Sequence, residues 1–429
     1  MAGALMTSMA LAGAGAFAGT AGATAPTNLW VAKTGPYAGN GKSCAKPGFS
    51  SVQAALNAAA GSSTVHVCAG TYSEQLTITK PVSLKASGAV TLQLPASPAD
   101  STTPCEVATP SDPHYQDEVD VCTSGSVTLI GFTVHADWPA GTCNDDLNAV
   151  LVAGGATLRM TNDSVTAAGA VPLNGCQGGI GIEVGMAWTT PVQVGHAVMN
   201  TVSVSGYQKN GITVDGSGST ATINKATVTG IGATNAIAQN GIQISNGAKG
   251  TITKSTISGN ECDDTAGGCG PDSLTNVQSV GVLLYAQAAG SGISGSTLSN
   301  NDIGVYVLDD PSAPAPTKST ANIATSTFTN NRYEGVILDQ GLTTLRRLNI
   351  SGSTAALQML QYDGQTYGAR GTANFLTITG ATYSLQIRSD DSPSDKPGSI
   401  TLSNSSFGGG VYDNQNPSAF SARENNDTL

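Results

Sequence analysis

Five carboxylates lie in one stretch of the chain and are its best candidates for chemistry. They are Asp302, Asp309, Asp310, Glu334 and Asp339. Carboxylates can transfer protons in catalysis, and their oxygens are the ligands that calcium prefers. The nearest basic residues are Arg332, Arg346 and Arg347, of which Arg332 is the candidate base. The competing interpretation is that these acids are ordinary turn residues.

Two aromatic residues are candidates for stacking on a sugar ring. Tyr306 lies among the first acids, and Trp138 lies near a second set. The second set comprises Asp145, Asp146, Asp263 and Asp264, with Glu183 nearby in register. Such crowded carboxylates could bind calcium, although no Asp-x-Asp-x-Asp-Gly loop occurs. The sequence identifies no cofactor with certainty, and calcium is the candidate metal.

A repeat must position these residues. From about residue 120 onward, a small residue is followed by apolar, any and apolar residues, at intervals of roughly 22 to 40 residues. Clear copies begin at Gly181, Gly211, Gly241, Gly281, Gly304 and Gly335, and weaker ones span 149–152, 356–359 and 384–387. Such a period is typical of a solenoid in which each repeat is one coil.

A second short strand recurs between these copies and ends in Gly or Asn. Examples are Thr227–Gly230, Thr256–Gly259 and Thr297–Asn300. Because Gly and Asn best tolerate the left-handed backbone region, the pattern predicts a tight turn with positive φ at this position. A third strand precedes the second, as at 221–223 and 250–252.

Three short strands per coil send alternate side chains inward, and stacked coils bury them. We therefore predict an all-β parallel β-helix of roughly ten to twelve coils, with strands about 4.8 Å apart. A β-sandwich or barrel is the rival, but it would show hairpin signals and a shorter period. The segment Ser50–Gln53 resembles a capping box, and Val52, Ala55, Leu56 and Ala59 share one helical face. These residues predict an N-terminal cap helix.

The repeat also places the eight cysteines. Cys143 and Cys176 lie in successive loops and would bridge neighbouring coils. Cys44 with Cys68 would tie the cap to the first coil, while the pairs Cys105 with Cys122 and Cys262 with Cys269 flank two loops. Without a C-x-x-C pair, disulfides are favoured over a redox or metal role, which indicates an oxidising compartment.

The same register of the repeat places Asp309 and Asp339 on adjacent coils.

The division of the chain follows from these patterns. Residues 1–25 have the apolar stretch and Ala-x-Ala sites of a secretory signal peptide, without its basic start. A disordered Ala/Gly-rich terminus is the alternative. Residues 26–407 form the predicted β-helix with its cap, and residues 408–429 form a polar tail.

The charge of the chain limits its partners. It carries 18 Lys and Arg against 29 Asp and Glu, a net charge of −11, which argues against nucleic acid. No apolar run after the leader is long enough to span a membrane. We expect a secreted monomer, extracellular or at the cell surface, whose partner is an extracellular polysaccharide.

Residues 49–84 resemble the entrance of the pectin-lyase-like β-helix proteins. They combine the cap helix with Val65-His66-Val67, Gly70-Thr71-Tyr72-Ser73-Glu74 and Leu76-Thr77-Ile78. The later Gly-Ile/Val-x-apolar copies resemble the parallel β-helix repeat of the same superfamily, so the resemblance covers nearly the whole mature chain. It implies a right-handed, secreted β-helix. That fold hosts lyases, hydrolases, esterases, epimerases and non-enzymes.

Two local motifs resemble those of particular enzymes. The segment Gly70–Glu74 matches the Gly-x-Tyr-x-Glu of pectin methylesterases, but the later aspartates and arginine of that family are missing. We interpret this segment as a first-coil turn packed on the cap helix. Asp309-Asp310 resembles the aspartate pair of polygalacturonase-like hydrolases, but all four histidines precede residue 200. One of them, His114, lies among acids and is interpreted as an exposed loop residue.

Two functions compete. The first is a polysaccharide lyase or glycoside hydrolase that acts in a groove, with calcium or on a neutral glycan, since the net charge repels a polyuronate. The second is a non-catalytic cell-surface or matrix protein that binds glycan or serves as a scaffold. It is favoured by a mostly uncharged row of outward residues, namely Glu183, Thr213, Gln243, Leu283, Tyr306, Ile337, Gln358 and Gln386. Converging carboxylates in a groove would favour the first function.

Overall fold

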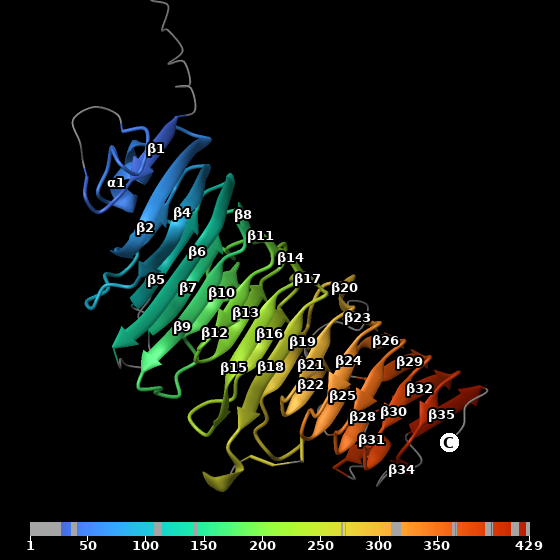
Figure 1. Ribbon diagram of the computed structural model, residues 1–429. Coiled ribbons are helices and arrows are strands. Elements are labelled where there is room, and N and C mark those ends of the chain that lie inside the picture. Colours follow the sequence, from blue (N-terminus) through green and yellow to red (C-terminus); the bar gives the residue numbers. More distant parts are fainter. Residues whose placement is uncertain are drawn as a thin grey trace, which may run out of the picture.

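The computed structural model describes residues 27–35, 41–106, 114–139, 145–266, 269–270, 272–309, 319–362, 365, 367–390, 396, 398–412 and 420–425. The signal peptide expected at 1–25 lies outside this part of the chain. Figure 1 shows a rod of stacked coils that runs from β1 (Asn28–Val31) and α1 (Val52–Ala58) to β35 (Phe420–Asn425). The predicted all-β parallel β-helix is confirmed.

The small-apolar-x-apolar copies form one sheet of twelve strands, here called sheet I. Every pairing in it is parallel. Its strands, in order along the rod, are β3 (Leu76–Ile78), β5 (His114–Cys122), β7 (Asp145–Ala153), β10 (Ile180–Val184), β13 (Asn210–Asp215), β16 (Asn240–Ser245), β19 (Val280–Tyr285), β22 (Ile303–Leu308), β25 (Glu334–Asp339), β28 (Ala355–Gln361), β31 (Tyr383–Ser389) and β34 (Gly410–Tyr412).

The remaining strands form a second sheet that covers two further faces of the rod. The faces are joined where long strands of the first coils run through both, namely β2 (Ser63–Ser73), β4 (Val82–Gln93) and β6 (Ser126–Pro139). One face continues as β8 (Ala156–Thr161), β11 (Gly195–Asn200), β14 (Thr220–Asn224), β17 (Lys249–Thr253), β20 (Ser291–Ser294), β23 (Thr320–Ala324), β26 (Leu342–Arg346), β29 (Arg370–Asn374), β32 (Gly398–Ser403) and β35. The other continues as β9 (Ser164–Val171), β12 (Ser203–Ser205), β15 (Thr227–Thr234), β18 (Thr256–Cys262), β21 (Thr297–Ser299), β24 (Thr327–Thr329), β27 (Asn349–Ser351), β30 (Thr377–Thr379) and β33 (Ser406–Phe407).

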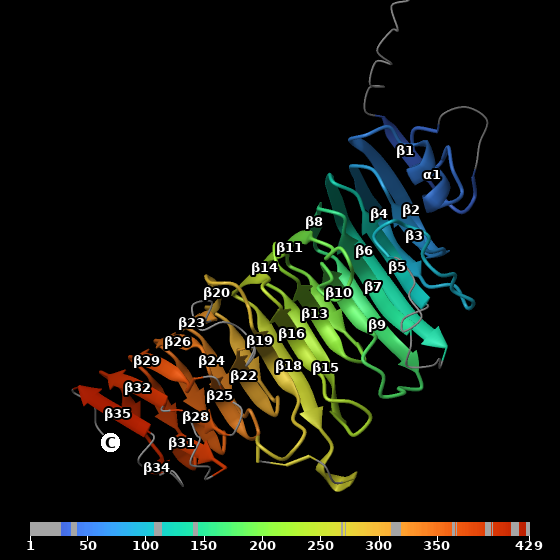
Figure 2. The ribbon, with the colours of Figure 1, turned by 180° about the vertical axis from the view of Figure 1, so that it is seen from behind.

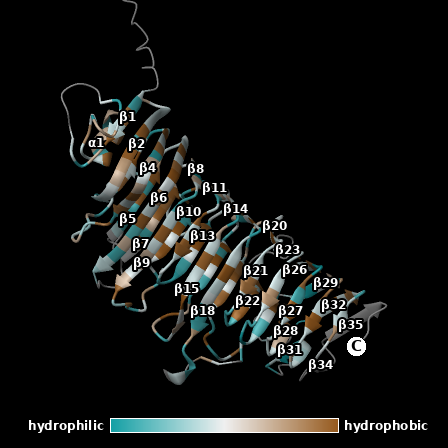
Figure 3. Ribbon diagram, in the orientation of Figure 1, coloured by the Kyte–Doolittle hydropathy of each residue, from teal (hydrophilic) through white to brown (hydrophobic). Residues whose placement is uncertain are grey.

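Alternation along each strand builds the core. In β26, Thr343 and Leu345 are buried while their neighbours are exposed, and the same alternation recurs on the stacked strands. Figure 3 shows the result as brown and teal residues in turn. One cluster of buried Val, Ile, Leu and Ala runs from Val31 to Leu402. Burial of this apolar surface is the main favourable term in folding.

The predicted positive-φ turns are present with one correction. Gly259, Asn300 and Asn330 have φ of 74°, 53° and 52°. Gly230 is different, because the register of β15 against β18 shifts there and Gly232 takes the positive φ of 82° instead.

Buried amides bridge the coils next to these turns. Asn260 Nδ2 donates to Asn301 Oδ1 at 2.8 Å, and Asn301 Nδ2 donates to Asn331 Oδ1 at 3.0 Å. All three residues are fully buried. Each amide therefore satisfies the next, which a low-dielectric interior requires of polar groups.

The cap helix begins one residue later than the sequence predicted. Its N-cap is Ser51, whose Oγ accepts a hydrogen bond from the amide of Ala54. In the predicted capping box, the Gln53 side chain would reach back to the N-cap. In the structure, the Glu74 side chain makes the contacts at this end of the helix instead. This carboxylate accepts from the amides of Val52 and Gln53 at 2.8 and 3.1 Å and from the Ser51 hydroxyl at 2.6 Å. The Gly70–Glu74 segment is thus a first-coil turn packed on the cap helix, as interpreted from sequence.

Three of the expected disulfides are present: Cys44–Cys68, Cys105–Cys122 and Cys262–Cys269. Cys176 is also disulfide-bonded, but its expected partner Cys143 lies outside the described residues. The segment after β18, with the short 3-10 turn Asp264–Ala266, projects from the side of the rod (Figures 1 and 2).

Coils continue into the segment predicted as a polar tail. Strand β34 pairs with β31, and β35 pairs with β32. The stack therefore extends past residue 407. Among the described residues, no helix is long and apolar enough to cross a membrane.

Glu74 should be important for stability. Replacing it with alanine leaves the first amides of α1 without their acceptor, which costs about 1–3 kcal/mol, and Glu74→Gln should cost less because one acceptor oxygen remains. Thermal unfolding followed by circular dichroism at a fixed scan rate measures this. Glu261→Ala on β18 is the control, and an equal fall of the midpoint for both alanine variants would contradict the capping role.

Candidate functional site

The outer face of sheet I carries the predicted row of outward residues. Register pairs Glu183, Thr213, Gln243, Leu283, Tyr306, Ile337, Gln358 and Gln386 one above the next. The row is not a bare surface, since Ile337 and Gln358 are fully buried. Something therefore covers this face.

The cover is the segment 272–279, here called the strap. It precedes β19 but reaches along the rod as far as β31, where Asp272 Oδ2 lies 2.8 Å from Arg388 Nη2. On the way, Ser273 Oγ hydrogen-bonds to Gln358 Oε1, and Leu274 packs against the apolar group of Val280, Ile303, Ile337 and Leu360. The strap thus crosses the strands in between and turns a flat face into a covered one.

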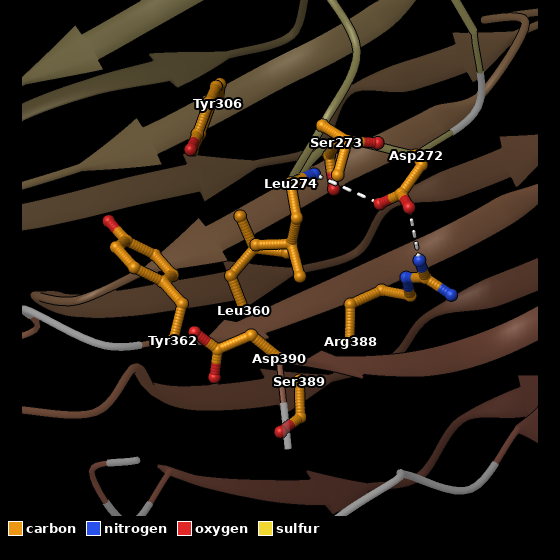
Figure 4. Close-up of a pocket in the computed structure, with 10 residues that line it drawn as sticks. Asp272, Ser273, Leu274, Tyr306, Leu360, Tyr362, Arg388, Ser389 and Asp390 are labelled. Carbon is orange, nitrogen blue, oxygen red and sulfur yellow. Dashed lines mark hydrogen bonds and ion pairs between the residues drawn. The ribbon is translucent and has the colours of Figure 1, made fainter. Parts of the chain in front are cut away.

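A pocket of about 540 Å³ lies between the strap and sheet I (Figure 4). The strap forms one wall, with Asp272, Ser273, Leu274 and Thr275. The opposite wall is formed by Tyr306, Leu360, Tyr362, Arg388, Ser389 and Asp390. The lining therefore combines aromatic rings and leucines with an ion pair and hydroxyl groups.

Asp339 lies directly behind the two tyrosines. Its Oδ2 accepts hydrogen bonds from the hydroxyls of Tyr306 and Tyr362, both at 3.0 Å, and its Oδ1 accepts from Gln365 Nε2 at 2.8 Å. The side chain has no exposed surface. Burial raises the pKa of Asp339 to about 6, although the three hydrogen bonds oppose the shift. Burial and the Asp339 charge in turn raise the pKa values of both phenols, which stay protonated donors.

Glu334 begins β25, three residues before Ile337 of the predicted row, and is also buried, at 1% exposure. Its Oε1 accepts from Gln358 Nε2 at 3.3 Å. Burial, and then the charge of Asp302, raise its pKa well above the usual value, which favours the neutral acid.

Asp302 and Arg332 hold the base of the strap loop. Asp302 Oδ2 accepts from the amides of Cys262 and Ser279 at 2.9 and 2.8 Å, so one carboxylate ties both ends of the loop that carries the strap. Arg332 forms an ion pair with Asp302 Oδ1 and donates from Nη2 to the Cys262 carbonyl at 2.6 Å. Its Nη1 lies 3.1 Å from Asp264. These contacts make Arg332 a positioning residue for the loop.

Asp309 holds the base of the next insertion, residues 310–318, in the same way as Asp302 holds the strap loop. It accepts hydrogen bonds from the Ser319 amide at 2.9 Å, from the Ser319 hydroxyl at 2.8 Å and from the Tyr367 hydroxyl. It thereby ties the two ends of the segment 310–318. Asp310 lies outside the described residues. Among the predicted acids that the structure describes, two pairs lie close together: besides burial, the charge of Asp302 raises the pKa of Glu334, and the charge of Asp309 raises that of Asp339. Asp339 lies behind the pocket. Their catalytic role stays a prediction.

The two predicted aromatic contacts differ. Tyr306 lines the pocket, whereas Trp138 is buried in the core at 1% exposure and has no face open to a ligand. Of the second acid set, Asp263 binds Thr265 of its own loop, and Asp264 contacts Arg332 and Tyr333. The side chains of Asp145 and Asp146, and that of His114, lie outside the described residues.

A different set of acids clusters near the N-terminal end of sheet I. Carboxylate oxygens of Glu106, Asp117 and Asp120 all lie within 4.8 Å of one another, and all three residues are buried. This cluster could hold a metal ion.

Sequence reasoning missed most of the pocket. Tyr362, Arg388, Asp390 and the strap acid Asp272 had no part in the predicted site, nor did Glu106 in the acid cluster. One signal existed: the register that pairs Leu360 with Arg388 places the arginine on the outer face of sheet I. The path of the strap has no signal in the repeat, because insertions between coils follow no period.

The comparisons with known proteins agree on the fold. The family described as "Right handed beta helix region" matches residues 192–367. A search of curated protein sequences gives no match. Among solved structures, the A-module of mannuronan C-5 epimerase AlgE4 from Azotobacter vinelandii is 12% identical, with a TM-score of 0.51 over 88% of this chain and 94% of that one.

Two further structures are similar over most of this chain. The GH136 lacto-N-biosidase from Eubacterium ramulus is 10% identical, with a TM-score of 0.54 over 89% of this chain and 68% of that one. The catalytic domain of Agl-KA is 12% identical, with a TM-score of 0.54 over 85% of this chain and 63% of that one. At such identities the likeness concerns the fold. The chain is a right-handed parallel β-helix of the pectin-lyase-like fold.

The buried Asp339 should make stability depend on pH. Its pKa is about 6 in the folded chain and about 3.9 in an unfolded one, so its contribution is full below pH 4 and is lost as the pH rises through 6. Relative to Asp339→Asn, the wild type should lose about 3 kcal/mol between pH 4 and pH 7. Denaturant titrations of both proteins across this range measure it, and parallel pH profiles would contradict it.

The Asp302–Arg332 pair should hold the strap loop. Arg332→Gln leaves the buried Asp302 without its counter-charge, for which a loss of about 3–5 kcal/mol is expected. Arg346→Gln, on the exposed side of β26, is the control and should change stability little. Limited proteolysis should cut the Arg332 variant first between residues 263 and 278, and an unchanged cleavage pattern would contradict the role.

Proposed function

We propose that the protein binds a neutral glycan in the pocket beneath the strap. The observation that carries this proposal is the pair of tyrosine hydroxyls, Tyr306 and Tyr362, which line the pocket and both donate to Asp339. Since each phenol has its donor engaged, its oxygen remains an acceptor for a ligand hydroxyl. A sugar presents many such hydroxyl donors, together with apolar ring faces.

The remaining lining supports a ligand of this kind. The rings of Tyr306 and Tyr362 are partly exposed, and Leu274 and Leu360 add apolar surface. Arg388 and Ser389 supply donors, and Asp390 supplies acceptors. Apolar walls with a few polar groups are typical of small-molecule sites.

The charge of the pocket selects against uronates. Arg388 is paired with Asp272, while Asp390 and the ionised Asp339 add negative charge at neutral pH. A carboxylate-bearing polysaccharide would therefore be repelled unless a cation bridged it. The net charge of −11 acts in the same direction.

Disulfides support a location outside the reducing cytoplasm. Cys44–Cys68, Cys105–Cys122 and Cys262–Cys269 are bridges of the kind that persist in oxidising compartments. We infer that the protein is secreted and that its partner is an extracellular polysaccharide. The similar structures include a mannuronan epimerase and a lacto-N-biosidase, which supports a carbohydrate ligand.

Cleavage of the bound glycan by a lyase or hydrolase reaction is the second candidate. It is favoured by the two carboxylates on the pocket walls, Asp272 and Asp390, since paired carboxylates are the usual acid and base of glycoside hydrolysis. In that case Asp272→Asn and Asp390→Asn should abolish turnover but retain binding. The alternative is a glycan-binding scaffold without turnover.

Variants of Tyr362 separate these roles. If the ring and the phenol oxygen only bind sugar, Tyr362→Ala should weaken binding roughly tenfold, as expected for the loss of a stacking aromatic, and Tyr362→Phe should weaken it less. If the phenol moves a proton, Tyr362→Phe should lower kcat while KM changes little. Calorimetry and reducing-sugar release with neutral and uronate glycans, with and without calcium, measure both.

Phe375→Ala is the matched control. Phe375 is an exposed aromatic on a turn of another face, beside Arg347. Its loss should leave glycan affinity unchanged. Absence of binding by any neutral glycan, or equal effects of Phe375→Ala and Tyr362→Ala, would overturn the proposal.

A further inference from the structure

A second site lies where the first coils carry three acids. Glu106, Asp117 and Asp120 are 4%, 3% and 3% exposed, and one oxygen of each lies within 4.8 Å of the others. Asp117 and Asp120 belong to β5, and Glu106 belongs to the segment that precedes it. Two separate pieces of chain thus bring carboxylates to one buried point.

The fold holds this arrangement covalently. The Cys105–Cys122 disulfide joins the residue before Glu106 to the end of β5, so Glu106 cannot move away from the strand. Ser101 adds to the attachment, because its amide donates to the Tyr115 carbonyl at 2.7 Å and its hydroxyl donates to Asp120 Oδ2 at 3.2 Å. Asp120 pairs with Leu151, and Leu151 with Glu183, so it faces outward on sheet I.

The state of Asp120 points to a ligand. Its Oδ1 is buried and has no hydrogen-bond donor, and the residue as a whole is only 3% exposed. A buried carboxylate oxygen without a donor or cation is costly.

We propose that Glu106, Asp117 and Asp120 bind a calcium ion. All three ligands offer carboxylate oxygens, which hard cations prefer, and the set has no histidine or thiolate for zinc. Carboxylate oxygens that lie within 4.8 Å of one another can ligate the same calcium ion, since calcium–oxygen distances are about 2.4 Å. Magnesium usually keeps several waters and takes one or two carboxylates, so three buried carboxylates suit calcium better. Calcium here would attach the segment before β5 to the sheet.

This site is separate from the pocket. Strand β5 lies six strand positions from β22, which carries Tyr306, and that is about 29 Å along the rod. The proposal therefore stands or fails independently of glycan binding. It also differs from the expected calcium set, of which Asp263 and Asp264 lie on the loop after β18 while Asp145 and Asp146 begin β7.

Calcium titration of the chelator-treated full chain tests the proposal. Calorimetry should show one ion per chain, and the thermal midpoint should rise with the logarithm of free calcium. Asp120→Asn removes one ligand charge but keeps the shape, so it should weaken calcium at least about tenfold and remove the rise of the midpoint. Asp263→Asn, on the other acid set, should bind calcium like the wild type.

Further variants keep the test decisive. If Asp120→Asn fails to fold, Glu106→Gln and Asp117→Asn should show the same loss of affinity. A parallel titration with magnesium should give a much weaker response. No calcium binding by the wild type, unchanged affinity in all three site variants, or loss of affinity in Asp263→Asn would overturn the assignment.

Discussion

The stacking of coils in parallel register is the constraint on which the rest of this structure depends. Because each strand of sheet I pairs with its equivalent in the next coil, a side chain lies above the side chain at the same position one repeat earlier. Apolar residues gain from this placement, as the continuous core shows. Polar residues tolerate it only where they can satisfy one another, as Asn260, Asn301 and Asn331 do with their amides.

Carboxylates meet this constraint in different ways. Asp302 accepts backbone amides from both ends of one insertion, and Asp309 accepts an amide from the far end of the next. Each carboxylate therefore closes the base of a loop. Glu74 accepts the first amides of α1. Glu118, opposite small residues on later coils, has no exposed surface, and burial raises its pKa to about 10, so it is a neutral acid. The positions of Asp302, Asp309 and Glu74 are therefore explained by the loops and the helix that they hold, without a chemical role.

Two places on the outer face of sheet I are not explained in this way. At one end the strap leaves a pocket in which Tyr306 and Tyr362 share Asp339, and the balance of charge suits a neutral, hydroxyl-rich ligand. At the other end the Cys105–Cys122 bridge holds Glu106 beside Asp120, and the balance of charge suits a cation. The same rigid sheet supports both, because loops on a fixed scaffold can be positioned independently.

The sequence by itself determined the repeat and the fold class, and it predicted the cap helix and three disulfide pairs, because these depend on periodic patterns and on residues in the same or a neighbouring coil. The outward row from Glu183 to Gln386 was also predictable in register. Tertiary structure alone decided which acids lie near open space. Asp302 and Arg332, which were predicted as catalytic residues, hold the base of a loop. Tyr362, Arg388 and Glu106 were not predicted as site residues, yet they lie at the pocket and at the acid cluster. The physical reason is that insertions fold back across several coils, and no period in the sequence encodes where they cross.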